Sequence, residues 1–206
     1  MVENHIENKV PLTLTDRLRL FFKPLLERMG IGLYELGIRP NMITLFGLIG
    51  TVIGTIFVAS GNLMLGGFFI LLMGPIDALD GAVARASGTV TRFGAFLDSV
   101  IDRYIESLIY AGLIFYFNGQ QQTLGIMLSF FSLVGSVLVS YARARAESLG
   151  IDTKIGILTR VERLVVIGPT IFFKIPLVGV AVVAVLANFT ALQRINHVKK
   201  QIEAEE

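Results

Sequence analysis

Three long stretches of the chain are almost free of charged residues. They run over residues 40–76, 107–142 and 164–193, and only Lys174 interrupts the last one. A helix crosses a hydrocarbon core of about 30 Å with about 20 apolar residues, so each stretch is long enough for two crossings. Helices are expected because unpaired backbone groups are costly in lipid.

Turn-forming residues lie inside each stretch. They are Gly61 and Asn62 in the first, residues 118–122 in the second and residues 174–176 in the third. Glycine, asparagine and proline favour the backbone conformations of tight turns. The pattern therefore predicts an all-α integral membrane protein with six transmembrane helices in three hairpins.

The segment before the first stretch has a different pattern, in which apolar residues recur at helical spacing among charged ones. These apolar residues are Leu14, Leu18, Phe21, Phe22, Leu25 and Met29. This spacing predicts an amphipathic helix that lies in the membrane interface. A solvated helix packed on the rest of the protein fits the same pattern. Pro24 is expected to kink or interrupt the helix, because proline lacks the N–H of the helical ladder.

The basic residues predict the orientation. All 18 lysines and arginines except Lys174 lie on one predicted side of the membrane. They occur in four segments: before residue 41, from Arg85 to Arg103, from Arg143 to Arg163, and after residue 193. Cytoplasmic loops are enriched in basic residues, so we predict a cell-membrane protein with both termini and both polar connections in the cytoplasm. The net charge of +2 is small, which indicates topology and not nucleic-acid binding.

The composition agrees with a membrane protein and narrows the chemistry. Hydrophobic residues make up 53% of the 206 residues, charged residues 17%, and the mean hydropathy is +0.70. There is no cysteine, so disulfides and thiolate metal sites are excluded. The two histidines, His5 and His197, lie in polar surroundings near opposite ends of the chain. A metal site in this chain is therefore expected to use oxygen ligands.

Four aspartates between the first two stretches form two pairs at helical spacing. Asp77 and Asp80 are three residues apart, and Asp98 and Asp102 are four apart. Each pair would project from one face of a helix. Four crowded carboxylates repel one another unless cations compensate them. We expect two Mg²⁺ ions, with Mn²⁺ as the alternative, because these hard cations bind carboxylates together with phosphate.

The same aspartates could instead pair with basic residues at helix ends, namely Arg85, Arg92 and Arg103. The neighbouring small residues favour a ligand site, because Gly81 and Gly94 allow a backbone or a flat ligand to approach closely. Glu106 extends the face of the second pair by four residues. Its carboxylate is expected either to support the site or to pair with a nearby base.

The segment from Asp77 to Asp102 resembles the signature of the CDP-alcohol phosphatidyltransferases. It contains Asp-x-x-Asp-Gly-x-x-Ala-Arg, eight further residues, and Gly-x-x-x-Asp-x-x-x-Asp. The resemblance implies that all four aspartates bind metal and that Asp98 and Asp102 are catalytic, with Asp102 as the candidate general base. It also implies a set of CDP-binding residues: Asn41, Thr44, Asp77, Asp80, Gly81, Ala84, Arg85 and Gly94.

Arginines later in the chain are candidates for binding a substrate phosphate. The fifth predicted helix is too short to span unless it begins among charges, so residues 160–163 are expected to line a wet cavity. Guanidinium groups suit phosphate, although contact with lipid headgroups is the alternative. The region resembles the phosphatidylinositol-phosphate synthase branch, which implies an acceptor site at Arg143, Arg160 and Arg194. Arg143 stands where that branch has lysine, and Thr159 and Val161 replace its glutamate and proline.

The predicted function is magnesium-dependent transfer of a phosphatidyl group from CDP-diacylglycerol to a phosphorylated alcohol. By resemblance the acceptor is inositol phosphate, and the products are phosphatidylinositol phosphate and CMP. Glycerol phosphate or another alcohol, and an archaeal-type CDP-lipid donor, remain open. A divalent-cation transporter is the hypothesis from a different class, since carboxylates also line ion pathways.

This function assigns roles to three parts of the chain. Residues 40–195 would form the catalytic six-helix domain, between a cytoplasmic segment (1–39) that includes the amphipathic helix and a cytoplasmic polar tail (196–206). The expected partners are the two substrates and membrane lipids, with no nucleic acid. Resemblance also implies a homodimer. Close helix packing, within one subunit or between two, would be allowed by Gly47, Gly50 and Gly54.

Overall fold

The computed structural model describes residues 14–153 and 155–205. This part of the chain is helical and contains no strand, as predicted for the fold class. It forms α1 (Leu14–Glu35), α2 (Pro40–Ala59), α3 (Leu63–Ala86), α4 (Arg92–Gly119), α5 (Thr123–Ser148), α6 (Arg160–Phe172) and α7 (Pro176–Glu205). Residues 1–13 of the predicted N-terminal segment, and the side chains of residues 14–20 and Asp77, lie outside this description.

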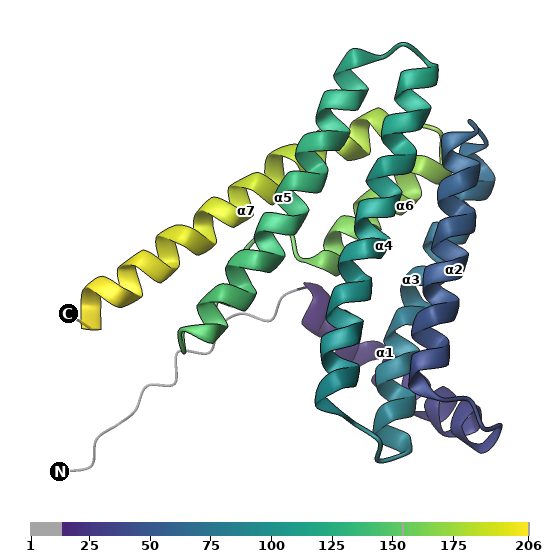
Figure 1. Cartoon of the computed structure of the whole chain (residues 1–206), viewed down its shortest axis with the longest axis vertical. Coiled ribbons are helices and arrows are strands. Elements are labelled where there is room, and N and C mark those ends of the chain that lie inside the picture. The colour runs from purple at the N-terminus through teal and green to yellow at the C-terminus, as the bar shows by residue number, and fades with distance from the viewer. Residues whose placement is uncertain (1–13, 154, 206) are drawn as a thin grey trace.

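Tight turns join the helices at the three predicted places. α2 and α3 are separated by residues 60–62, α4 and α5 by residues 120–122, and α6 and α7 by residues 173–175. At the first turn Gly61 has a φ of 89°, in the left-handed region that glycine adopts without a steric cost. All three turns lie at one end of the bundle, and the connection from α3 to α4 lies at the other (Figure 1).

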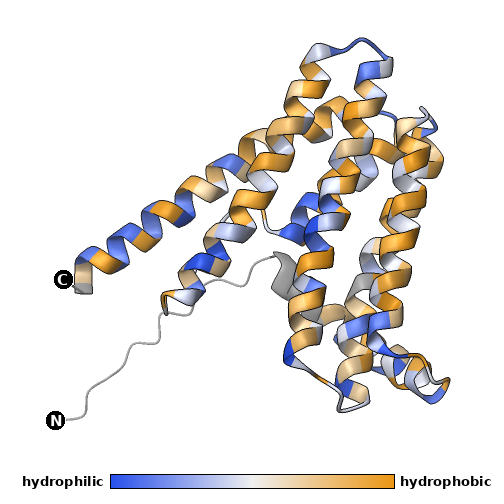
Figure 2. Ribbon diagram, viewed as in Figure 1, coloured by the Kyte–Doolittle hydropathy of each residue, from blue (hydrophilic) through white to orange (hydrophobic). Residues whose placement is uncertain are grey.

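Within the described residues, four helices are long and apolar enough to cross a membrane: α2, α3, α5 and α7. Figure 2 shows apolar residues over much of their length, while the first turn of α6 is hydrophilic. α6 has only 13 residues, which is about 20 Å of helix and shorter than a hydrocarbon core of about 30 Å. Length and composition therefore support four of the six predicted spans.

α1 runs through Pro24 without a break, so the expected interruption is not observed. Proline removes one helical hydrogen bond and crowds the carbonyl four residues earlier, but α1 packs against α3. The two helices approach closely at Gly30, where an added Cβ would lie 2.8 Å from the backbone of Ala82. Phe21 is 78% exposed and Leu25 53% exposed. The described part of the apolar face is therefore available to lipid.

Glycines set how closely α3 packs on its neighbours. α2 packs against α3 and α4, α5 against α7, and α6 against α3 and α7. A Cβ on Gly50 would lie 2.3 Å from the Met73 sulfur, and one on Gly54 would lie 3.0 Å from the Phe69 side chain. These two glycines of α2 therefore pack against α3 of the same subunit. α3 meets α6 at Gly67.

Replacing Gly67 by alanine is expected to force α3 and α6 apart. The new Cβ would lie 2.5 Å from the backbone nitrogen of Phe172, which cannot rotate away as a flexible side chain could. Overpacking of this kind lowers the free energy of unfolding by about 1–3 kcal/mol. Thermal unfolding in detergent, followed by circular dichroism, measures the effect. Gly74→Ala, in the same helix but with nothing within 4 Å, is the matched control. Equal melting temperatures for the two variants would contradict the prediction.

Candidate functional site

Asp80 of α3 is held in place by a residue of α2. Its side chain is buried, with 8% of the residue exposed. The Thr44 hydroxyl donates a hydrogen bond of 2.6 Å to one carboxylate oxygen, and the Gly81 N–H donates one of 2.5 Å to the other. Both oxygens therefore have fixed directions. Thr44 was predicted to bind CDP, and the structure gives it a contact with the aspartate site.

α4 presents the second aspartate pair. The helix begins at a cap in which the Thr91 hydroxyl accepts a hydrogen bond of 3.0 Å from the Gly94 N–H. An added Cβ at Gly94 would lie 3.0 Å from that same hydroxyl, which gives a local reason for glycine. Beyond the cap, Asp98 is half-buried and Asp102 is 8% exposed. The pair thus lies about two to three turns inside α4.

The first turn of α6 meets Asp102. Arg160, the first residue of α6, lies 2.7 Å from one carboxylate oxygen of Asp102, and Arg103 lies 3.6 Å from the other. A capping box between Thr159 and Glu162 fixes the beginning of α6. The predicted acceptor arginine and the predicted general base are therefore in direct contact.

Arg163 does not line a wet cavity, which corrects the expectation for residues 160–163. It is 1% exposed, and its guanidinium forms two bonds of 2.5 and 2.9 Å with Glu106 of α4. Of the two expectations for Glu106, pairing with a base is the one observed. Burial is possible because each carboxylate oxygen accepts a charge-assisted hydrogen bond. α4 and α6 are thus joined by two ion pairs, one at the aspartate site and one deeper.

The other two predicted acceptor arginines lie near the crossing of α5 and α7. Arg194 is buried, and it donates to the backbone carbonyls of Val139 on α5 and Ile155 in the segment before α6. Arg143, one turn beyond Val139, is exposed and pairs with Glu147 at 2.8 Å. Contacts place Arg160 at the aspartates, and Arg194 and Arg143 at this crossing.

The remaining residues predicted to bind CDP lie on α2 and α3. Asn41 and Arg85 are exposed, while Gly81 and Ala84 are half-buried. A Cβ on Gly81 would lie 3.2 Å from a guanidinium nitrogen of Arg85. The Arg85 side chain therefore extends back along α3 as far as Gly81.

The donor set fits a hard divalent cation in chemistry. Asp80, Asp98 and Asp102 offer only oxygen atoms, and the bond from Thr44 orients one of these carboxylates as an outer-shell partner would. Among the described side chains, which do not include Asp77, no three acidic or histidine residues are close enough to hold a metal ion. α3 contributes Asp80 to this donor set, and α4 contributes Asp98 and Asp102.

Comparison with known proteins identifies the relatives of this chain. The model of the CDP-alcohol phosphatidyltransferase family matches residues 38–199. An archaetidylinositol phosphate synthase from Pyrococcus horikoshii is 38% identical, over 91% of this chain and 98% of that protein. The crystal structure of Mycobacterium tuberculosis phosphatidylinositol phosphate synthase with CDP-DAG bound is 29% identical, with a TM-score of 0.77 over 85% of this chain and 94% of that one.

A second structure of the M. tuberculosis enzyme is in complex with manganese and citrate. It is 30% identical to this chain, with a TM-score of 0.76 over 84% of this chain and 88% of that one. The similarity therefore extends through most of the helical domain in both structures.

Sequence reasoning missed the contact between Thr44 and Asp80 and the burial of Arg163. Spacing held a signal for the second. Asp102 and Glu106 are four residues apart on α4, and Arg160 and Arg163 are three apart on α6. Each pair therefore lies on one helix face, so that each acid can pair with one arginine. The first contact joins two helices and leaves no periodic trace in either.

Thr44→Val is expected to weaken binding of divalent metal. Valine keeps the shape of the side chain but leaves Asp80 without its donor, and loss of such an outer-shell bond reduces metal affinity about tenfold or more. The midpoint of the rise in melting temperature with added MgCl₂ measures this. Thr44→Ser keeps the hydroxyl and serves as the control. If the valine variant has the wild-type midpoint, the contact does not support a metal ligand.

Proposed function

The chain belongs to the CDP-alcohol phosphatidyltransferase family, and on that premise we propose that it transfers a phosphatidyl group from CDP-diacylglycerol to inositol phosphate. The products are phosphatidylinositol phosphate and CMP. The family is one of transferases, so the alternative of a divalent-cation transporter is set aside. Relatives named as inositol phosphate lipid synthases support the acceptor.

The contact between Arg160 and Asp102 is the observation that carries this proposal. The guanidinium nitrogen is 2.7 Å from the carboxylate, and the arginine side chain is 20% exposed. A phosphate bound to this arginine would therefore lie beside Asp102. An acceptor with both a phosphate and a hydroxyl could use the two residues together, which favours a phosphorylated alcohol over a neutral one.

The reaction assigns a separate task to each group. The acceptor hydroxyl attacks the lipid-bearing phosphorus of the donor, a new bond forms between that oxygen and the phosphorus, and the bond to the bridging oxygen breaks to release CMP. Asp102 accepts the hydroxyl proton. Arg160 holds the acceptor phosphate, with Arg143 and Arg194 contributing positive charge on the same substrate. Asn41, Gly81 and Arg85 border the CDP group of the donor.

Two Mg²⁺ ions are proposed as cofactors, held by Asp77, Asp80, Asp98 and Asp102. When bound, they would neutralise charge on the diphosphate. The oxygen-only donor set supports a hard cation, and the manganese complex of the M. tuberculosis relative supports a divalent one. In this chain Thr44 keeps the Asp80 carboxylate directed.

In the proposed membrane arrangement, α4 and α6 add two spans to the four apolar helices. Both termini and the aspartates face the cytoplasm, as the distribution of basic residues predicts. α4 carries its charged residues between Arg92 and Glu106, where Arg160 and Arg163 pair with Asp102 and Glu106. A homodimer completes the proposal, with exposed apolar helix faces available for it.

The donor lipid has a second candidate. The P. horikoshii relative is named an archaetidylinositol phosphate synthase, and this supports testing a CDP-archaeol donor beside CDP-diacylglycerol. Glycerol phosphate is the competing acceptor, since it also joins a phosphate to a free hydroxyl.

Purified protein in detergent is expected to release CMP from CDP-diacylglycerol when Mg²⁺ and inositol phosphate are both present. Asp102→Asn should reduce turnover by about a hundredfold or more, because the general base is lost. Glu203→Gln, on the exposed end of α7, is the control and should keep the wild-type rate. CMP release should be measured with inositol phosphate, glycerol phosphate and inositol, and with both donors. No release from any combination would overturn the proposed function.

Arg160→Ala is expected to raise the KM for inositol phosphate by about tenfold to a hundredfold, the loss of one charge-assisted hydrogen bond. The KM for the CDP-lipid should stay within about twofold, because that substrate is bound elsewhere. Arg145→Ala removes an exposed arginine of α5 and is the matched control. An unchanged acceptor KM in the Arg160 variant would remove this residue from the acceptor site.

A further inference from the structure

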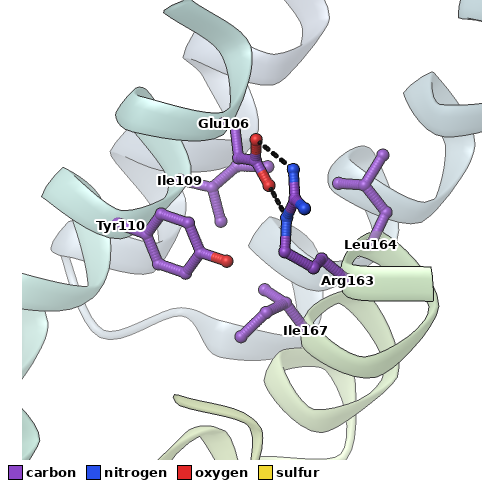
Figure 3. Close-up of a pocket in the computed structure, with 6 residues that line it drawn as sticks. All are labelled: Glu106, Ile109, Tyr110, Arg163, Leu164 and Ile167. Atoms are coloured by element: carbon purple, nitrogen blue, oxygen red, sulfur yellow. Dashed lines mark hydrogen bonds and ion pairs between the residues drawn. The ribbon is translucent and has the colours of Figure 1, made fainter. Parts of the chain in front are cut away.

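Glu106 and Arg163 form an ion pair in apolar surroundings. Figure 3 shows the two side chains facing each other, with Tyr110 of α4 and Ile167 of α6 beside them. The exposed fractions are 4% for Glu106 and 1% for Arg163. The guanidinium donates to both carboxylate oxygens, at 2.5 and 2.9 Å, and its third nitrogen donates to the Leu158 carbonyl at 3.1 Å. Every charged group of the pair therefore has a partner.

Stability alone gives little reason for this pair. Bringing two charges out of water is costly, and replacing a buried ion pair by apolar residues of similar volume is often neutral or stabilising. Most of the neighbouring side chains are apolar, and the Tyr110 hydroxyl already has Ser136 as a partner, so such a replacement would fit its surroundings. The pair therefore has to be explained by what it fixes in space.

The pair fixes the first turn of α6 relative to α4. α6 has its extensive backbone packing with α3 and α7, and α4 is not among its closely packed partners. Side chains make the link instead, through Glu106 with Arg163 and Asp102 with Arg160. Because Arg163 also binds the Leu158 carbonyl, it ties the segment before α6 to the same point of α4.

We propose that Glu106 and Arg163 are positioning residues, which hold Arg160 beside Asp102 for the phosphorylated acceptor without touching either substrate. The buried pair of Glu106 with Arg163, the inner pair, sets the register of α6 against α4. The pair of Asp102 with Arg160 is the outer one. The outer pair then places a phosphate-binding guanidinium next to the residue that takes the proton. This inference rests on the proposed function and gives the acceptor site its structural support.

The test is a double variant, Glu106→Leu with Arg163→Met, which leaves no unpaired charge. It should fold with a melting temperature close to that of the wild type, while the KM for inositol phosphate rises about tenfold and the KM for the CDP-lipid does not change. A merely structural role would lower the active fraction and leave both KM values unchanged, and that result would overturn the inference. Lys199→Ala with Glu203→Ala, an exposed pair on α7, is the matched control.

A second measurement asks whether the pair acts through Arg160. In an Arg160→Ala background, the double variant should cause no further rise in the acceptor KM, because its target is already gone. Effects that multiply would contradict the positioning role. Glu106→Gln, which keeps the shape and one hydrogen bond, covers the case in which the double variant does not fold. This variant should also raise the KM for inositol phosphate while the KM for the CDP-lipid stays unchanged. Failure of the proposed function itself is recognised separately, by a wild-type protein that releases no CMP.

Discussion

Pairing between the acids of α4 and the arginines of α6 is the interaction on which the arrangement of the site depends. α4 lies among apolar helices and still carries buried carboxylates, and an uncompensated buried charge is strongly destabilising. α6 supplies the compensation at two levels, Arg163 for Glu106 and Arg160 for Asp102. Fold and site are therefore determined together. The ion pairs that compensate the buried carboxylates of α4 also place the Arg160 guanidinium beside Asp102.

Close packing of α2 on α3 has a comparable double effect. Gly50 and Gly54 let the two helices approach, because an added Cβ would press on the Met73 side chain at Gly50 and on Phe69 at Gly54. That closeness brings the Thr44 hydroxyl within hydrogen-bond distance of Asp80. The aspartate is thus oriented from the neighbouring helix and from its own backbone. A weakly packed interface at this point would leave the carboxylate free to rotate.

The sequence predicted the features that depend on local chemistry. The turns between paired helices followed from residues such as Gly61. The opposite ends did not follow from the apolar runs, since α4 already begins at Arg92 and α7 continues to Glu205. The helical spacing of the aspartates also holds on α3 and α4. Features that depend on contacts between helices were missed, because Arg163 looks like any basic residue until Glu106 is seen opposite it. Of the kink or interruption expected at Pro24, the interruption is not observed, since α1 continues through this residue and packs on α3.

The shortness of α6 has a consequence for how the two substrates meet. A helix of about 20 Å leaves about 10 Å of a 30 Å hydrocarbon layer unfilled on one side. In the proposed orientation that side is the cytoplasmic one, and the helix begins there with the hydrophilic turn that contains Arg160 (Figure 2). The charged side chain of Arg160 would then lie below the headgroup plane, where a phosphate of the acceptor could neutralise it. The phosphorylated acceptor proposed above would then reach the reacting phosphorus without entering the hydrocarbon core. The lipid donor would present that phosphorus without leaving the bilayer.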